Sequence, residues 1–169
     1  MPSANTYDLI VIGTGPAGEK AAVKAAYFGK KVAIIEKEKC YGGAGINTGT
    51  IPSKTLKESA LYYSGKYDTG IYGHDRVLDG QTTIQDFLFR KNYVIESLEQ
   101  EVLKNLERHD VKLFHGTASF EDKNTVLIDG DDGEIRITGD YVLIATGSYP
   151  FHPENIDFDG IIVHDSDSI

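Results

Sequence analysis

Near its start the chain reads Tyr7-Asp8-Leu9-Ile10-Val11-Ile12-Gly13-Thr14-Gly15-Pro16-Ala17-Gly18, an apolar run that leads into a glycine-rich turn. The run is rich in β-branched residues and does not alternate strictly, which predicts a central parallel strand covered on both faces. Alanines at helical spacing follow the turn, with Pro16 suited to a first helical turn and Gly29 to the stop. A second buried strand is expected over residues 31–36. These segments predict a β-α-β unit of about 30 residues and the α/β class.

Residues 13–18 form a G-x-G-x-x-G sequence between the predicted strand and the predicted helix. In this pattern Gly13 permits a tight turn, Gly15 lets backbone approach a pyrophosphate, and Gly18 lets helix and strand pack closely. Glu36 ends the second strand 23 residues after Gly13, near the spacing of about 20 typical of a carboxylate that binds ribose hydroxyls. We therefore expect an adenine dinucleotide with an unphosphorylated ribose, although the pattern does not separate NAD from FAD. The alternative is that the glycines serve only a turn and that Glu36 is a solvated strand end.

The middle of the chain is expected to be helical. A glycine-rich loop over residues 40–49 should lead into a helix with Pro52 in its first turn, and residues 64–80 should be irregular. Thr82 followed by Gln85 resembles a capping box, and an apolar stripe then predicts the longest helix as far as Arg108.

In the last third of the chain, the hydrophobic pattern changes to the two-residue period typical of strands. Residues 111–114, 116–120, 125–128 and 134–138 are predicted as short strands of a small antiparallel meander. Residues 141–145 are predicted as a further buried strand. The acidic residues 129–134 fit a hairpin turn better than a calcium loop, because the glutamate expected at the twelfth loop position is missing.

Composition excludes several classes of partner. The 169 residues carry a net charge of −9, which argues against binding to nucleic acid or an anionic membrane. No apolar run approaches the roughly 20 residues that a membrane span needs. The start lacks the pattern of a signal peptide and the single cysteine cannot form an internal disulfide, so we expect a cytoplasmic protein. The five histidines show no metal spacing, and no metal site is expected.

The charge is unevenly distributed along the chain. Residues 1–60 contain 8 Lys and Arg against 5 Asp and Glu, a local charge of +3, whereas residues 61–169 carry −12. We expect an anionic ligand to be held by the first third.

A second motif suggests a family. The stretch Tyr41-Gly42-Gly43-Ala44-Gly45-Ile46-Asn47-Thr48-Gly49-Thr50-Ile51-Pro52-Ser53-Lys54, together with Gly116-Thr117-Ala118 and Ala145-Thr146-Gly147, resembles the FAD-binding half of the pyridine nucleotide-disulfide oxidoreductases. The resemblance covers nearly the whole chain. It implies a Rossmann-like FAD/NAD(P)-binding three-layer fold with a parallel central sheet and a small antiparallel β-meander, with residues 1–169 as the FAD-binding domain.

The redox cysteines of that family are missing here. Disulfide-using members carry two cysteines ahead of a Pro-Ser-Lys, and Gly45 and Thr50 occupy those two positions. Cys40 lies five residues before Gly45 and cannot replace the pair. Dithiol–disulfide exchange needs an attacking thiolate and a second sulfur, so a lipoamide or glutathione reductase mechanism is excluded. Threonine at the second position resembles the soluble pyridine nucleotide transhydrogenases, whose first position is commonly cysteine.

That branch implies an enzyme in which hydride passes between NADPH and NAD⁺ through FAD. Lys54 is then the catalytic candidate, near flavin N5, and its alternative is a solvated first-turn lysine. Ser53 is expected to cap its helix. The other residues implied in cofactor binding are Gly13, Gly15, Pro16, Ala17, Gly18, Glu36, Lys37, Gly42, Gly43, Ala44, Gly45, Gly49, Thr50, Gly116, Ala118, Ala145, Thr146 and Gly147.

The resemblance also implies parts beyond Ile169: an NAD(P)-binding domain, a dimerisation domain and a homo-oligomeric whole. The chain alone is expected to have no nicotinamide turnover. Two other functions stay open, namely a dihydrolipoamide dehydrogenase-like flavoprotein that reduces another acceptor such as a quinone, and a non-catalytic nucleotide-binding module.

Overall fold

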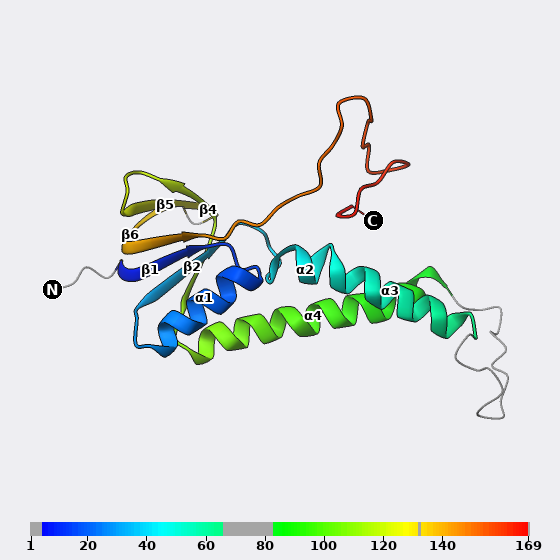
Figure 1. Ribbon diagram of the computed structural model, residues 1–169, viewed down its shortest axis with the longest axis horizontal. Helices are drawn as coiled ribbons and strands as arrows, with labels where there is room; N and C mark the ends of the chain where they lie inside the picture. The colour runs from blue at the N-terminus through cyan, green and yellow to red at the C-terminus, as the bar shows by residue number, and fades with distance from the viewer. Residues whose placement is uncertain (1–4, 66–82, 132, 169) are drawn as a thin grey trace.

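The computed structural model describes residues 5–65, 83–131 and 133–168, which form one mixed sheet with helices (Figure 1). The elements are β1 (Thr6–Ile12), α1 (Pro16–Tyr27), β2 (Val32–Glu36), α2 (Gly43–Asn47), α3 (Thr50–Tyr63), α4 (Ile84–Arg108), β3 (Lys112–His115), β4 (Thr117–Phe120), β5 (Thr125–Gly130) and β6 (Gly133–Ile144). The strand order is β3-β2-β1-β6-β5-β4. The predicted α/β class and β-α-β unit are confirmed, while nearly all of the expected irregular segment 64–80 lies outside the described residues.

The centre of the sheet is parallel. β1 pairs in parallel with β2 on one side and with β6 on the other, so that Leu9 lies between Val32 and Tyr141. Ile10 packs into an apolar cluster on one face and Val11 into a second cluster on the other, and both are fully buried. This confirms that the first predicted strand is covered on both faces.

Helices cover one face and antiparallel strands the other. α1 and the end of α4 contribute Ala22 and Leu106 to the Val11 cluster. On the opposite face, β5 and the first half of β6 contribute Val126, Ile128 and Ile137 to the Ile10 cluster. The molecule therefore has the three layers expected: helices, parallel strands and a small antiparallel unit.

The boundaries of that antiparallel unit differ from the prediction. β3 was expected within it, but β3 pairs in parallel with β2, with Leu113 opposite Ile34. The antiparallel pairing of Gly130 with Gly133 confirms the hairpin expected at the acidic cluster.

The two strands expected over residues 134–138 and 141–145 are one continuous strand, β6. Its first half pairs antiparallel with β5 and its second half parallel with β1, and Thr138 pairs with both Thr125 and Thr6. Gly139 does not interrupt the strand. A Cβ there would lie 2.9 Å from Ile10 Cδ1, so the glycine allows close approach to the Ile10 side chain of β1. The expectation of burial over residues 141–145 was wrong at Tyr141 and Ile144, which are 75% and 63% exposed.

The helix starts also differ in detail. The capping box of α4 consists of Thr83 and Asp86, one residue later than expected: Thr83 Oγ1 accepts from the Asp86 N–H, and the Asp86 carboxylate accepts from the Thr83 N–H at 2.8 Å. The loop expected over residues 40–49 contains the short helix α2. The predicted Ser53 cap was wrong, because Gly49 is the N-cap of α3 and the Ser53 hydroxyl donates to carbonyls of Gly49 and Thr50.

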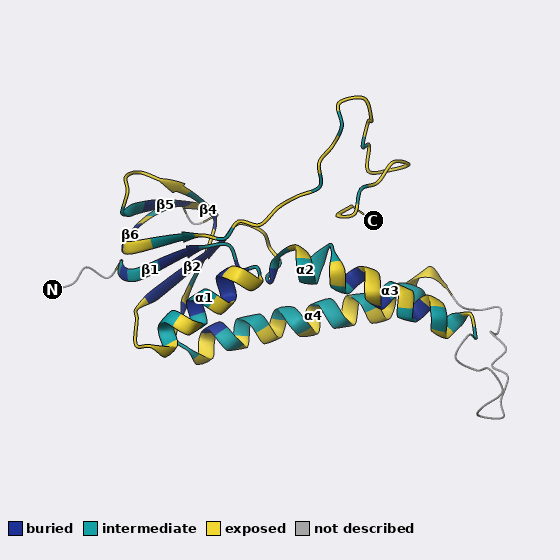
Figure 2. Ribbon diagram, viewed as in Figure 1, coloured by how far each residue is buried: buried dark blue, intermediate teal, exposed yellow. Residues whose placement is uncertain are grey.

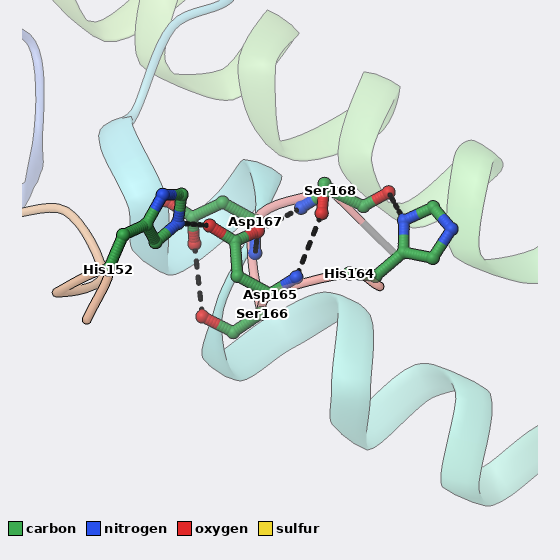
Figure 3. A network of polar contacts seen from close by, with 6 residues as sticks. All are labelled: His152, His164, Asp165, Ser166, Asp167 and Ser168. Carbon is green, nitrogen blue, oxygen red and sulfur yellow. Dashed lines mark hydrogen bonds and ion pairs between the residues drawn. The ribbon is translucent and has the colours of Figure 1, made fainter. Parts of the chain in front are cut away.

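Burial is concentrated in the sheet, with further buried residues on α1 and α3, whereas residues 148–168 extend away from the sheet and are mostly exposed (Figure 2). This segment is organised by its own polar contacts (Figure 3). His152 Nε2 lies 2.6 Å from Asp165 Oδ2, and Ser168 Oγ accepts from the Asp165 N–H. Hydrogen bonds from His152 and Ser168 lower the pKa of the Asp165 carboxyl. The Ser166 hydroxyl donates to Asp167, so the network is a turn rather than a serine activated by histidine.

Within the described residues, no helix is long and apolar enough to cross a membrane.

Candidate functional site

Two glycines of the β1–α1 turn are required by the fold itself. Gly13 has a φ of +105°, and a Cβ on it would lie 2.4 Å from the carbonyl oxygen of Ala145. A Cβ on Gly18 would lie 1.9 Å from the carbonyl oxygen of Gly13. The turn is therefore pressed between the end of β6 and the first turn of α1, with no room for a side chain at either position.

Gly15 differs, because nothing in the described part of the chain requires a glycine there. Its φ and ψ of −58° and 175° suit any residue, and a Cβ would meet only Gly43 Cα at 3.9 Å. Gly15 is also the N-cap of α1 and supplies no side-chain acceptor to the N–H groups of the first turn. This open backbone beside a helix N-terminus fits a phosphate group that approaches closely.

Glu36 points inward, toward the glycine turn. Its Oε2 accepts hydrogen bonds from the N–H and the hydroxyl of Thr14 at 2.9 and 2.6 Å, and its Oε1 accepts from the N–H groups of Lys37 and Glu38 at 2.9 and 3.0 Å. The residue is only 8% exposed. A carboxylate has about four lone-pair sites, so these donors fix its orientation. A ribose hydroxyl that reached Glu36 would share an oxygen with one of them or replace it.

The loop that follows β2 is hydrogen-bonded to the β1–α1 turn, to α4 and to α2. The Gly42 N–H donates to Thr14 Oγ1 at 3.1 Å, and the Tyr41 N–H donates to Glu99 Oε1 on α4 at 2.9 Å. The Asn47 amide donates to the carbonyls of Tyr41 and Gly43. A Cβ on Gly43 would lie 2.9 Å from Gly15 Cα, so the loop lies directly against the glycine turn.

Comparison with protein families decides the assignment. A family model described as pyridine nucleotide-disulphide oxidoreductase matches residues 7–168. The chain belongs to this family. Its members include flavoproteins, and the predicted resemblance is confirmed.

Two curated relatives carry the same name, soluble pyridine nucleotide transhydrogenase. The protein from Mycobacterium bovis (strain BCG / Pasteur 1173P2) is 42% identical over 165 residues, covering 96% of this chain and 35% of the relative. That from Colwellia psychrerythraea is 40% identical over 172 residues, covering all of this chain and 36% of the relative. The chain thus spans about a third of the length of these relatives.

A solved structure confirms the fold. The Cu(II) complex of the HOCl-induced flavoprotein disulfide reductase RclA from Escherichia coli matches with a TM-score of 0.74 and 30% identity. The match covers 89% of this chain and 30% of that one. The three-layer arrangement is therefore that of flavoprotein disulfide reductases.

Residues 45 and 50, where the resemblance predicts the cysteines of disulfide-using members, carry no sulfur. Gly45 lies in α2, where a Cβ would meet only Pro16 Cγ at 3.9 Å, and Thr50 begins α3. Cys40 is half-buried, and burial, followed by the nearby charges of Glu99, Glu38 and Glu36, raises the pKa of its thiol. A raised pKa disfavours the thiolate needed for nucleophilic attack.

Lys54 lies in the second turn of α3 and is exposed. Among the described residues its ammonium makes no ion pair with a carboxylate. Its side chain is therefore not held in place by a partner in the described part of the chain, and its role toward flavin stays a prediction.

The segments at Gly116 and Ala145 reach the ends of β1 and β2 beside the turn, whereas Ala118 and Gly49 lie away from it. The Gly116 N–H donates to the Glu36 carbonyl at 2.9 Å, and the Ala145 N–H donates to the Ile12 carbonyl at 2.9 Å, which brings both segments to the ends of β1 and β2. Ala118 instead packs against the core from β4, so only its backbone could reach a ligand. Gly49 contacts α2 rather than the turn, since its N–H donates to the Ala44 carbonyl. Seven others are exposed: Pro16, Ala17, Lys37, Ala44, Thr50, Thr146 and Gly147.

A cavity of about 560 Å³ lies on the α4 side of the turn. It is lined by Thr14, Pro16 and Gly42 from the site and by Glu19 and Asn105 from the facing helices. Glu19 is buried; its Oε1 accepts from the Asn105 amide and its Oε2 pairs with Lys20 Nζ at 2.7 Å. This pairing joins α1 to α4 behind the glycine turn.

Sequence reasoning missed four residues that shape the site: Thr14, Asn47, Glu99 and Asn105. Thr14 stood at a variable position of the motif, although a hydroxyl between two glycines signals a possible local hydrogen bond. Glu99 and Asn105 gave no local signal, because their partners lie 58 and 86 residues away in the sequence.

Proposed function

We propose that this chain is the FAD-binding domain of a flavoprotein that transfers hydride between NADPH and NAD⁺ without a redox-active disulfide. The observation that carries the proposal is an intact glycine turn, open at Gly15, beside a loop with no sulfur at residues 45 and 50. The two relatives named soluble pyridine nucleotide transhydrogenase support the same proposal. NADPH and NAD⁺ as substrates, a second domain that binds them, and a homo-oligomeric whole protein all belong to this proposal.

When bound, FAD would supply the ring that accepts a hydride from one nicotinamide and gives it to the other. The backbone of residues 13–18 would hold its pyrophosphate, with the helix dipole of α1 favouring the negative charge. Glu36 would accept from the adenosine ribose, where its charge disfavours a 2′-phosphate.

The flavin end would lie along residues 42–50, within reach of Lys54. A cation there stabilises the negative charge that the ring gains on reduction. Because residues 45 and 50 carry no thiol, the two electrons of the hydride would have no route to a disulfide and would leave only to a second acceptor.

The test is an assay of the whole protein that carries this chain, with NADPH as donor, an NAD⁺ analogue of distinct absorbance as acceptor, and no disulfide substrate. We expect reduction of the analogue at a rate that requires bound flavin. A flavin-loaded protein that transfers nothing to the analogue would remove the proposal.

The structural match to a flavoprotein disulfide reductase favours one second candidate, a reductase of another acceptor such as a quinone. A screen of quinones and dyes on the same flavin-loaded protein separates the two candidates. A transhydrogenase needs no acceptor other than the NAD⁺ analogue, whereas the second candidate needs the quinone or dye. A third possibility, a nucleotide-binding module without catalysis, predicts bound nucleotide and no turnover with any acceptor.

A further inference from the structure

Thr14 joins two parts of the site through one hydroxyl group. The side chain is completely buried. Its Oγ1 donates to Glu36 Oε2 at 2.6 Å and accepts from the Gly42 N–H at 3.1 Å. A hydroxyl can donate one hydrogen bond and accept two, so both contacts form at the same time.

We propose that Thr14 is a positioning residue that couples the two ends of the dinucleotide site. This inference rests on the proposed binding of FAD. At the adenosine end Thr14 orients the Glu36 carboxylate, and at the flavin end it anchors the loop that leads into α2. A shift of the Thr14 side chain toward one end would therefore lengthen its hydrogen bond to the other.

Among the described residues, four groups donate to Glu36, and Thr14 supplies the one side-chain donor while the other three are backbone N–H groups. Its bond to the carboxylate is charge-assisted and therefore stronger than a bond between neutral groups. The β-branched side chain is also stiff about χ1, which favours a single orientation of the hydroxyl.

Loss of the hydroxyl would affect both ends. Gly42 is buried with a φ of +91°, and its N–H would lose its acceptor. A buried donor without a partner is unfavourable, so the loop would rearrange to satisfy it. Glu36 would keep its backbone donors but lose the side-chain donor that connects it to the loop.

The experiment compares Thr14→Val, which keeps the shape and removes the hydroxyl, with Thr14→Ser, which keeps the hydroxyl. The whole protein, freed of flavin, is titrated with ADP, which reaches only the adenosine end, and with FAD, which spans both ends. We expect Thr14→Val to weaken the binding of ADP by at least about tenfold, as for a lost hydrogen bond to a charged group. The binding of FAD should be weakened by a clearly larger factor. Thr14→Ser should stay within about twofold of wild type for both ligands.

Amide hydrogen exchange at Gly42 gives a readout independent of any ligand. Exchange in the flavin-free protein should be faster in Thr14→Val and restored in Thr14→Ser. Thr138→Val is the matched control: its hydroxyl bonds to Thr6 at the start of β1, and its loss should change neither Gly42 exchange nor the ratio of FAD to ADP affinity.

Equal affinities and equal Gly42 exchange in Thr14→Val, Thr14→Ser and wild type would overturn the role of Thr14 and leave flavin binding in place. Equal weakening of ADP binding and FAD binding in Thr14→Val would show that Thr14 does not couple the two ends, and it would also overturn the proposed role. A wild-type protein that binds neither ligand would overturn the proposed function, and this inference with it.

Discussion

Glu99, near the middle of α4, accepts a hydrogen bond from the Tyr41 N–H at 2.9 Å and so ties the longest helix to the loop of the candidate site. The two residues are 58 positions apart in the sequence. Because Glu99 also raises the pKa of the neighbouring Cys40 thiol, one carboxylate both holds the loop and disfavours a thiolate beside it.

Replacement of Glu99 should therefore change the reactivity of Cys40. Burial is the larger cause of the raised thiol pKa and would remain, so Glu99→Gln should lower the pKa only in part. The thiolate fraction at a given pH rises when the pKa falls, and alkylation by iodoacetamide below the thiol pKa should become faster. The measurement is the alkylation rate between pH 7 and 10. A rate profile identical to wild type would show that Glu99 exerts no effect on the thiol.

The glycines of the turn should separate into two classes on substitution. Gly18→Ala places a Cβ against the Gly13 carbonyl and should destabilise the fold by about 3 kcal/mol or more. Gly15→Ala meets no such contact and should change the free energy of unfolding by less than about 0.5 kcal/mol, while weakening FAD binding. Urea denaturation and flavin titration measure the two effects. Equal destabilisation by both substitutions would contradict the distinction.

Asn105 should matter for stability because Glu19 is buried between α1 and α4. Asn105→Ala removes the donor to Glu19 Oε1 and should cost about 1–3 kcal/mol, as for a buried group left unsatisfied. Lys104→Ala, at the adjacent exposed position, is the control and should change the free energy of unfolding by less than about 0.5 kcal/mol. Both are measured by denaturant unfolding, and a loss as small for Asn105→Ala as for the control would exclude a stabilising role for the pair.

The exposed turn at Asp159 should be sensitive to acid. Three N–H groups, from Ile161, Ile162 and Val163, donate to Asp159 Oδ1 and lower the pKa of its carboxyl to about 2. The pKa of this carboxyl is lower in the folded turn than in the unfolded chain, so the ionised carboxylate stabilises the turn. This stabilisation is complete at a pH above the ordinary aspartate pKa of about 3.9, and it is lost as the pH falls through about 2.

Amide exchange at residues 161–163 in the acid range measures that transition, and Asp159→Ala is the variant that should abolish the protection. Protection in the variant equal to that of wild type at neutral pH would contradict the assignment.

Much of the fold follows from local pattern. β1, α1 and β2 lie where β-branched runs, Pro16 and the alanine spacing predicted them, because each of these signals acts within a few residues. The extent of β6 could not be predicted in this way, since it depends on which strand lies beside each half. The inward orientation of Glu36 likewise depends on Thr14, and contacts such as Glu99 with Tyr41 arise only when distant segments meet in space.

The two-sided pairing of β6 restricts how the length of this strand can vary among related sequences. Alternate residues of a strand face opposite sides, so one residue inserted or deleted near Gly139 would invert the facing of one half relative to the other. Either Ile137 would leave the core between the layers, or Leu143 would turn away from the helices. We expect insertions and deletions to be absent from this strand and to be found instead in the exposed turn between β4 and β5.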